Sequence, residues 1–392
     1  MPGVAVATET PAPARSRSFV PLLSVGLLTG VGYALAGPFL SLFLIKELDS
    51  GPVEVGAFLL TSSLAALVAS TLIGRWSDRR AVRRALLVGA SVVGAVGFVL
   101  FAVLRNYWAL LGVQLTLFAV ASCLMPQMFA YGRQLLAGSP RAPLATSTLR
   151  VMMSVAWVGG PPVAALLIAG TGFNGLFLVS AGVYLVGAVL AFAFLPELGL
   201  PTTAAAPVAD VRGARTELLL AAAAFVLLQG ATGVTVTAMP LFVTDELGGT
   251  TGDAGLILGL CAFLEIPLML GFGWLAMRID LRRLVLAGGA VALAYHGVVL
   301  LATTSWQVAA AQALHAVVIS AVMGVGISYF QDLAPDRPGY ATTVFTNTNK
   351  VSLMLAGPLV GVAQHFGYRS AFAIGLVLSA AGLVLLFAAR RR

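Results

Sequence analysis

Long apolar runs, separated by short polar breaks, make up nearly the whole chain. About twelve of them reach the length of a transmembrane helix, which needs about 20 apolar residues to cross a ~30 Å hydrocarbon core. They lack the alternation of apolar and polar residues that marks membrane β-strands, and only helices or closed barrels satisfy the backbone in lipid. The pattern therefore predicts an all-α membrane protein. Its expected spans cover approximately residues 19–44, 53–74, 84–104, 107–131, 143–168, 173–195, 216–243, 252–275, 284–303, 306–330, 341–365 and 369–389.

The composition agrees with this interpretation. The chain has 392 residues, of which 59% are hydrophobic and 10% charged. A soluble protein carries about 25% charged residues, so a soluble fold is excluded. The net charge of +8 does not indicate nucleic-acid binding, because the arginines occur in short clusters between apolar runs. Cys123 and Cys261 both fall inside expected spans, which favours small apolar fillers over a disulfide or a metal pair.

The distribution of Lys and Arg predicts the orientation. If the N-terminus is cytoplasmic, 18 of the 23 Lys and Arg residues lie in cytoplasmic segments, and only Lys46, Arg105 and Arg369 lie in outer loops. This bias is the positive-inside pattern, so both termini are expected in the cytoplasm. Residues 1–17, rich in Ala, Pro and Thr, are interpreted as a disordered cytoplasmic tail.

The chain looks internally duplicated. Residues 196–215, rich in Pro, Ala and Thr, read as a flexible cytoplasmic linker between an N-terminal six-helix bundle (18–195) and a C-terminal one (216–392). Landmarks recur across the two halves at an offset of 195 to 199 residues, which indicates two homologous repeats. The matched landmarks are Gly56 with Gly255, Gly74 with Gly273, Arg83-Arg84 with Arg282-Arg283, Met125 with Met323, Tyr131 with Tyr329, Gly160-Pro161 with Gly357-Pro358, and Gly172 with Gly367. Parallel six-helix repeats are a transporter architecture.

One acidic residue lies deep inside an expected span. Glu265 sits near the middle of Gly255–Arg283 and aligns with Ala66 of the first repeat, so the acid is specific to the second half. An ionisable group at the bilayer centre costs about 2.5–3.5 kcal/mol or more, which points to a functional role. Three roles stay open: a proton-coupling carboxyl, whose neutral form is favoured out of water, a buried hydrogen bond or salt bridge, and a direct bond to substrate hydroxyls.

Two basic residues lie at comparable depth in the fifth and eleventh spans. Arg150 shares a helix face with Ser154 and Trp157, because the spacing is i, i+4, i+7. A guanidinium and an indole on one face would suit a sugar, with donors for hydroxyls and a flat plate for the ring. The alternative for Trp157 is packing against a neighbouring helix. Asn347 and Lys350 form the comparable face in the second half.

Gly74 to Arg84, in the loop after the second span, resembles the cytoplasmic loop motif of the major facilitator superfamily. The motif has Gly, three residues, Asp, then basic residues. Ala81 stands where a Gly is expected, and the second copy has Met277 in place of the Asp. Gly160-Pro161-Pro162 resembles the Gly-Pro element of antiporters in this superfamily. The resemblance implies two rocking six-helix bundles, with Gly74, Asp78, Arg79 and Arg83 as a gating latch; plain membrane anchoring is the alternative for the arginines.

Three further stretches, Pro38–Leu44, Met125–Ala130 and Ser154–Pro162 preceded by Arg150, are similar to bacterial sugar efflux transporters, as is the region Leu264–Pro267. This similarity implies a monomer in the bacterial inner membrane that exports sugars or glycosides in exchange for protons. In the superfamily, spans one, four, seven and ten line the cavity, which adds weight to their polar residues. The expected substrate contacts are Tyr33, Gln127, Arg150, Trp157, Gln229, Glu265, His315, Asn347 and Lys350. For Tyr33, Gln127, Gln229 and His315, an interhelical hydrogen bond is the alternative, and His315 is also a possible second proton site.

Two rival functions remain. A multidrug/proton antiporter would have a mostly apolar and aromatic cavity, whereas a sugar site needs many donors and acceptors. A membrane sensor that transports nothing would have no use for the duplication or the buried charges. The sequence has no P-loop, nucleotide fingerprint or metal-ligand cluster, so an ATP-driven pump and a membrane metalloenzyme lack their required parts. No enzyme activity, cofactor, metal or nucleic-acid partner is expected.

Overall fold

A computed structural model describes residues 19–136, 142–199, 216–335 and 338–389. All regular secondary structure in these ranges is helical. The predicted tail, and residues 200–215 of the predicted linker, lie outside the described residues. The N-terminal half consists of α2 (Phe19–Ala36), α3 (Leu40–Leu48), α4 (Pro52–Ser77), α5 (Arg83–Val103), α6 (Tyr107–Val113), η1 (Gln114–Phe118), α7 (Ala119–Ala121), α8 (Leu124–Leu135) and α9 (Ala142–Phe194). The C-terminal half consists of α10 (Thr216–Leu241), η2 (Phe242–Glu246), α11 (Thr251–Leu275), α12 (Leu281–Leu301), α13 (Ser305–Ile319), η3 (Ser320–Gly324), α14 (Gly326–Leu333), α15 (Pro338–Phe366) and α16 (Arg369–Ala388).

These elements correspond to the twelve predicted spans. Ten helical stretches in the described residues are long and apolar enough to cross a membrane. One of them contains both the fifth and the sixth spans, because α9 continues through a kink at Gly172, where φ is +68°. The other predicted span, α15, is not among the ten, because Thr, Asn and Lys residues fill the stretch from Thr342 to Lys350. The all-α prediction and its twelve helices are therefore confirmed.

Local sequence explains where several helices begin and break. The first span is interrupted at residues 37–39, around Pro38, and resumes as α3. Pro38 has no backbone N–H to continue the helix. At the start of α11, Thr250 accepts a hydrogen bond from the backbone N–H of Asp253, and the Asp253 carboxylate accepts one from the Thr250 N–H. This reciprocal capping box satisfies two free donors of the helix start.

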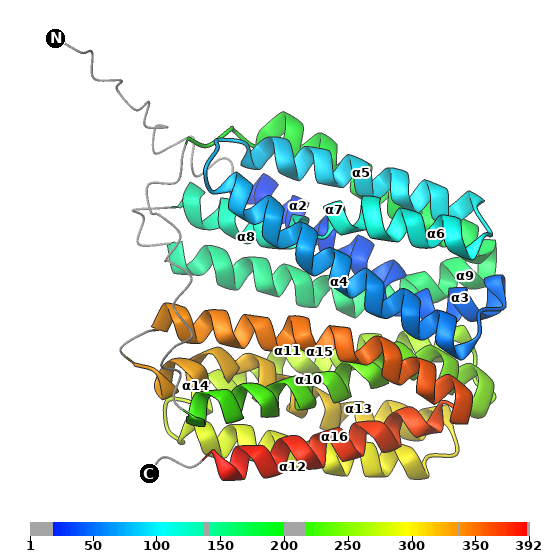
Figure 1. Ribbon diagram of the computed structural model, residues 1–392, viewed down its shortest axis with the longest axis vertical. Helices are drawn as coiled ribbons and strands as arrows, with labels where there is room; N and C mark the ends of the chain where they lie inside the picture. The colour runs from blue at the N-terminus through cyan, green and yellow to red at the C-terminus, as the bar shows by residue number, and fades with distance from the viewer. Residues whose placement is uncertain (1–18, 137–141, 200–215, 336–337, 390–392) are drawn as a thin grey trace.

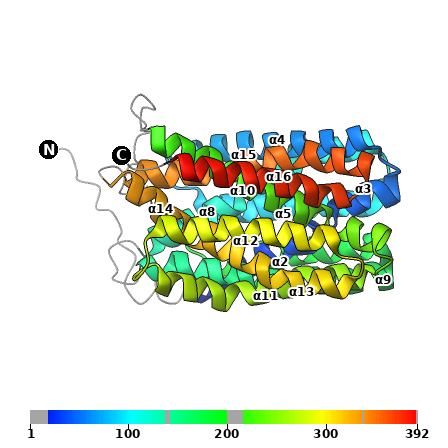
Figure 2. The ribbon, with the colours of Figure 1, turned by 90° about the horizontal axis from the view of Figure 1, so that it is seen from below.

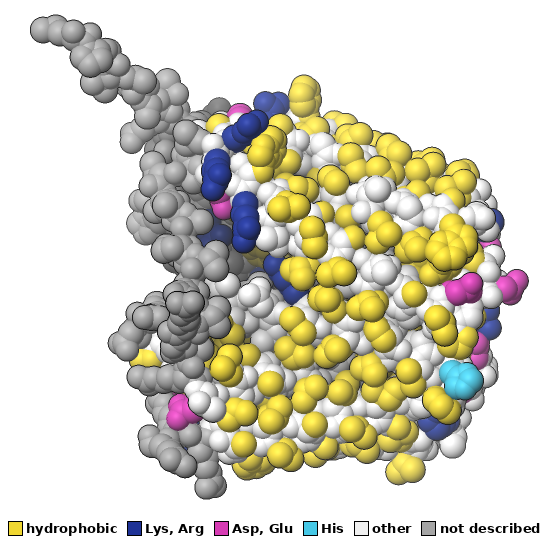
Figure 3. Space-filling view, in the orientation of Figure 1, with side chains coloured by type: hydrophobic (Ala, Val, Ile, Leu, Met, Phe, Trp, Pro, Cys, Tyr) yellow, Lys and Arg dark blue, Asp and Glu magenta, His cyan; other side chains and the backbone are white. Residues whose placement is uncertain are grey.

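The two halves form two bundles that lie side by side (Figure 1). In Figure 1 the N-terminal half (blue to green) lies above the C-terminal half (green to red), with α8 and α14 toward the left and α3 at the right. We call the side of α8 and α14 the terminal end and the side of α3 the distal end. The space-filling view shows Lys and Arg side chains gathered at the terminal end of the N-terminal half, an apolar band in the middle, and both acidic and basic side chains at the distal end (Figure 3). This is the charge distribution expected of a protein that spans a bilayer.

Four of the five tryptophans lie at the ends of helices, two at the distal end and two at the terminal end. Trp108 and Trp306 are exposed at the distal starts of α6 and α13. Trp76 and Trp274 are exposed at the terminal ends of α4 and α11, with Arg80 and Arg278 stacked over their rings at 5.2 and 4.0 Å. Exposed Trp at both ends of membrane helices is typical of the aromatic belts at the two bilayer surfaces.

The most extensive contacts between the halves are those of α4 with α15 and of α9 with α11 (Figure 2), and α3 also contacts α10. The tight contacts of both pairs lie in the distal half. A Cβ added at Gly361 of α15 would collide with the Pro52 carbonyl oxygen, and one at Gly255 of α11 would lie 2.6 Å from the Pro161 carbonyl oxygen. Toward the terminal end, a Cβ added at Gly74 or Gly273 would meet nothing within 4 Å. The seam is therefore closed at the distal end.

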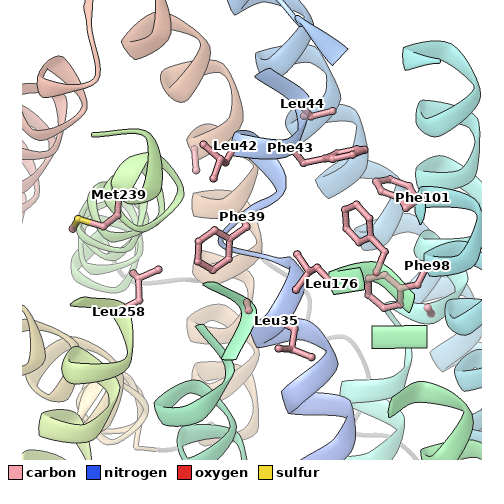
Figure 4. Close-up of a cluster of buried hydrophobic side chains, with 14 of the residues drawn as sticks. Leu35, Phe39, Leu42, Phe43, Leu44, Phe98, Phe101, Leu176, Met239 and Leu258 are labelled. Carbon is pink, nitrogen blue, oxygen red and sulfur yellow. The ribbon is translucent and has the colours of Figure 1, made fainter. Parts of the chain in front are cut away.

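The hydrophobic core also joins the two halves in their distal part. Its larger cluster crosses from one half to the other, and Phe39 and Leu42 of the N-terminal half lie against Met239 and Leu258 of the C-terminal half (Figure 4). The smaller cluster belongs to the C-terminal half alone, from Leu218 to Leu386. Apolar packing between the halves is thus concentrated in the distal half.

Candidate substrate and proton site

One face of α9 points into the space between the halves. Leu149, Met153 and Ala156 pack on α2, whereas Val158 and Pro162 pack on α11. Arg150, Ser154 and Trp157 lie between these two faces on the helical wheel, on the side away from the exposed valines that would face lipid. The predicted face is therefore directed to the interior of the molecule.

Tyr33 of α2 completes this face. Its ring centroid lies 6.0 Å from that of Trp157, at an interplanar angle of 59°. Tyr33 is 51% exposed although it lies in the last turn of α2, which packs on α9. Arg150 is also an exposed residue. Two aromatic rings and a guanidinium therefore border one accessible surface, which is the chemistry that sugar rings and hydroxyls require.

Glu265 is half-buried on α11 and also faces inward. Gly255 and Gly259 of α11 pack on α9, and Cys261 contacts His315 of α13. Phe263 and Leu270 are exposed on the side of α11 opposite Glu265. Glu265 lies on the wheel between the faces toward α9 and α13. Because α9 and α11 pack together, Arg150 and Glu265 come from neighbouring helices.

Lys350 lies along the other seam. It continues the stripe of Gly357 and Gly361 that packs on α4, two turns beyond Gly357 toward the terminal end, and Asn347 lies beside it. None of the four ion pairs found in the described residues includes Arg150, Glu265 or Lys350. The three charges line the seams without neutralising one another in this conformation, which leaves them available for a polar ligand.

Three of the predicted substrate contacts are buried inside a half. Gln127 is 3% exposed and donates a hydrogen bond to the Ser77 hydroxyl at 2.9 Å. Gln229 accepts one from the Thr348 hydroxyl at 3.4 Å. His315 stacks on Tyr295 at 4.4 Å between ring centroids, and its Nδ1 lies 3.3 Å from Gln312 Oε1 and 3.6 Å from Cys261 Sγ. In this conformation these side chains make the interhelical contacts that were the alternative interpretation.

The predicted latch residues contact their own half. Asp78, which ends α4, accepts a hydrogen bond from Arg83 Nη2 at 2.8 Å. Arg79 is exposed in the same loop. The linker begins against this region, because Glu197 accepts hydrogen bonds from the backbone N–H groups of Arg84 and Ala85 at 3.1 and 3.2 Å. Residues 77–85 and 197 therefore form one hydrogen-bonded unit of the N-terminal half.

Sequence reasoning missed two features. Cys261 is more than an apolar filler, since its thiol contacts His315. An ion pair joins the two halves at the distal end, between Lys46 Nζ and Asp245 Oδ1 at 2.9 Å. The sequence contained an indication of this pair. Lys46 and Asp245 differ by 199, which is within the repeat offset, so they occupy equivalent positions.

Comparison with known proteins identifies the family. The model of the Major Facilitator Superfamily matches residues 22–226 and 219–392. The chain belongs to the major facilitator superfamily. It is accordingly a multi-pass membrane transporter and not an enzyme, as the loop motif implied.

Several relatives match this transporter over nearly their whole length. Sugar efflux transporter A of Dickeya chrysanthemi is 35% identical over 94% of both chains. Sugar efflux transporter B of Salmonella typhimurium is 35% identical and covers 96% of this chain and 98% of its own. Sugar efflux transporter C of Escherichia coli is 34% identical and covers 93% and 94%, respectively. The resemblance to the sugar efflux transporters is confirmed.

Solved structures support the fold alone. A variant of the nucleoside transporter NupG superposes with a TM-score of 0.81 at 13% identity, over 95% of this chain and 98% of its own. A bacterial homologue of the lysosomal transporter Spinster gives a TM-score of 0.77 at 13% identity, over 97% of both chains. These similarities confirm the superfamily fold.

Proposed function

We propose that this transporter exports sugars or glycosides from the bacterial cytoplasm in exchange for protons, across the inner membrane. The relatives that match nearly its whole length are named as sugar efflux transporters, and the interior site has matching chemistry. The observation that carries the proposal is the face of Arg150, Trp157 and Tyr33 beside an unpaired carboxyl, Glu265. The rings would stack on the sugar, and the guanidinium would donate to its hydroxyls.

The terminal end is the cytoplasmic end in this proposal, because the arginines gather there. The conformation with a closed distal seam is then inward-facing, and the site is reached from the cytoplasm. Substrate binds from that side, and the halves rock so that the site opens outward. A proton from outside then binds Glu265 and removes a hydrogen-bond acceptor from the sugar, which leaves.

The decisive experiment uses inside-out vesicles with a panel of labelled sugars and an acid-inside pH gradient. Vesicles with the native transporter should accumulate a sugar only when the gradient is present. Glu265→Gln should abolish gradient-driven accumulation and retain sugar exchange without a gradient. Glu47→Gln serves as the matched control, because Glu47 pairs with Arg105 at the distal surface, far from the site. Gradient-driven accumulation by Glu265→Gln at the native rate would refute the proton role.

A panel of lipophilic cations in the same vesicles tests the alternative function, multidrug/proton antiport. Accumulation of these cations without any sugar flux would replace the sugar proposal with multidrug export.

A further inference from the structure

The distal mouth is closed by contacts between equivalent or nearly equivalent positions of the two repeats. Lys46 of α3 pairs with Asp245 of η2, and one turn deeper the Ser41 hydroxyl donates a hydrogen bond to the Thr237 carbonyl oxygen at 2.8 Å. Lys46 and Asp245 differ by 199, the offset that also relates Gly56 to Gly255, and Thr237 lies one turn before Pro240, the equivalent of Ser41 at that offset. Equivalent residues of two repeats can meet only near the axis that relates the repeats. Both contacts therefore lie at the centre of the distal mouth.

An apolar layer lies directly beneath these polar contacts. Phe39 and Leu42 point toward Met239 and Leu258 (Figure 4). All four side chains are at most 4% exposed, and they belong to the core cluster that crosses the seam. An apolar constriction resists the passage of water, ions and polar solutes because none of them finds a hydrogen-bond partner there.

We propose that these two layers form the outer gate of the transporter: the Lys46–Asp245 pair is the latch, and Phe39, Leu42, Met239 and Leu258 are the plug. The proposal rests on the proposed function for its orientation, since it takes the distal end as the outer one. Opening outward must separate Lys46 from Asp245 and divide the plug between the halves. The plug excludes water and protons while the site faces the cytoplasm, and the latch biases the balance between the two conformations.

The solvent exposure of the Lys46–Asp245 pair sets how strongly its loss should change the outward-open population. The side chains of Lys46 and Asp245 are 49% and 27% exposed. Ion pairs of this kind contribute little in water, so breaking the latch should raise the outward-open population about two- to five-fold. The plug, which is fully buried, should contribute the larger part of the barrier.

The chain supplies a matched control. Glu47 forms an ion pair with Arg105 at 3.3 Å, at the same end and with comparable exposure, but both residues belong to the N-terminal half. Removing this pair changes the distal surface charge without affecting the contact between the halves.

The first test locks the gate. Lys46→Cys with Asp245→Cys would be bridged by a short reversible thiol cross-linker, since the native Cys123 and Cys261 are buried. Bridging should stop transport, and a reductant should restore it, whereas bridging Glu47→Cys with Arg105→Cys should leave transport intact. Full transport by the bridged Lys46–Asp245 variant would overturn the proposal. If the native transporter moves no sugar at all, the proposed function fails instead, and the second test still examines the gate.

The second test needs no substrate. Leu42→Cys would be labelled from outside with a membrane-impermeant thiol reagent in right-side-out vesicles. Adding Lys46→Gln or Asp245→Asn should raise the labelling rate about two- to five-fold, the exchange Lys46→Asp with Asp245→Lys should restore it, and Glu47→Gln should not change it. Met239→Cys is the second reporter if Leu42→Cys folds poorly. An unchanged labelling rate in both charge variants would contradict the latch, and labelling from the cytoplasmic side instead would refute the orientation.

Discussion

The interiors of the two halves are built from equivalent helices but filled with different side chains. In the N-terminal half, Phe98, Phe101, Phe118 and Phe177 pack edge to face, with centroids 4.8 to 5.4 Å apart. In the C-terminal half, the corresponding helices bring together Tyr295, His296, Gln312 and His315. One repeat thus carries an aromatic core where the other carries hydrogen-bonding groups.

The difference indicates where the chemistry lies. The Nε2 atoms of His296 and His315 are buried and have no hydrogen-bond partner among the residues that the structure describes. A buried polar group left in this state costs about 1–3 kcal/mol. His315 contacts Cys261, which lies one turn from Glu265 on α11. The C-terminal half holds the titratable groups, and the N-terminal half supplies the rings and the guanidinium on a rigid apolar support.

The largest expected effect is the loss of an aromatic side chain from the N-terminal core. Phe98→Ala should lower the free energy of unfolding by about 3–5 kcal/mol, because it leaves a cavity among packed rings. Thermal unfolding of the purified protein in detergent would measure this. Phe263→Ala, at an exposed position of α11, is the control and should change stability little. Equal losses for both variants would mean that the ring cluster does not support this half.

The second prediction concerns a substitution that gives the C-terminal half the residue found at the equivalent position of the N-terminal half. His315 aligns with Leu117, at the offset of 198 that relates Met125 to Met323. His315→Leu should change the free energy of unfolding by less than about 1 kcal/mol, since it removes an unpaired buried group together with weak contacts. Gradient-driven transport should fall about tenfold if the imidazole serves Glu265, equivalent to about 1.4 kcal/mol. Normal transport by a stable His315→Leu protein would assign the imidazole to packing alone.

A smaller effect is expected at the terminal end, where the polar contact belongs to the N-terminal half. Gln127 aligns with Val325, and its bond to Ser77 has no polar equivalent at Ala276. Gln127→Val should cost about 0.5–1.5 kcal/mol and speed hydrogen exchange in residues 77–83. Ser77→Ala combined with Gln127→Val should cost less than the sum of the single changes, since both remove the same bond. Additive costs would show that the two side chains act independently.

The smallest effects are expected where the halves are alike. Glu47 and Glu246 differ by 199 and each pairs with an arginine of its own half, at 3.3 and 3.5 Å. Glu47→Gln and Glu246→Gln should each change stability by less than about 1 kcal/mol. Denaturation at low and high salt would test this, since screening should remove the difference from the native protein. A large loss in only one half would show that the pairs are not equivalent.

The sequence predicted the helices, their duplication and the inward face of Arg150, Ser154 and Trp157. These predictions depend on periodicity and helix length, which are local. Sequence reasoning could not decide what lies opposite Gln127, Gln229 or His315, because a helical wheel gives the direction of a side chain but not its partner. The Lys46–Asp245 contact was missed for a related reason: charges in short distal segments were interpreted as orientation signals, and the pair joins segments that are far apart in the sequence.

The four tryptophans at the ends of the helices should make the balance between the two conformations depend on the thickness of the surrounding bilayer. Each half carries one ring at the distal surface and one at the terminal surface, so each is fixed to both headgroup layers. A mismatch between the hydrophobic length of a protein and the thickness of its bilayer costs fractions of a kcal/mol per Å, which is comparable to the contribution of a single exposed ion pair. Acyl-chain length in reconstituted vesicles should therefore shift the balance between inward- and outward-facing transporters about as strongly as the loss of Lys46.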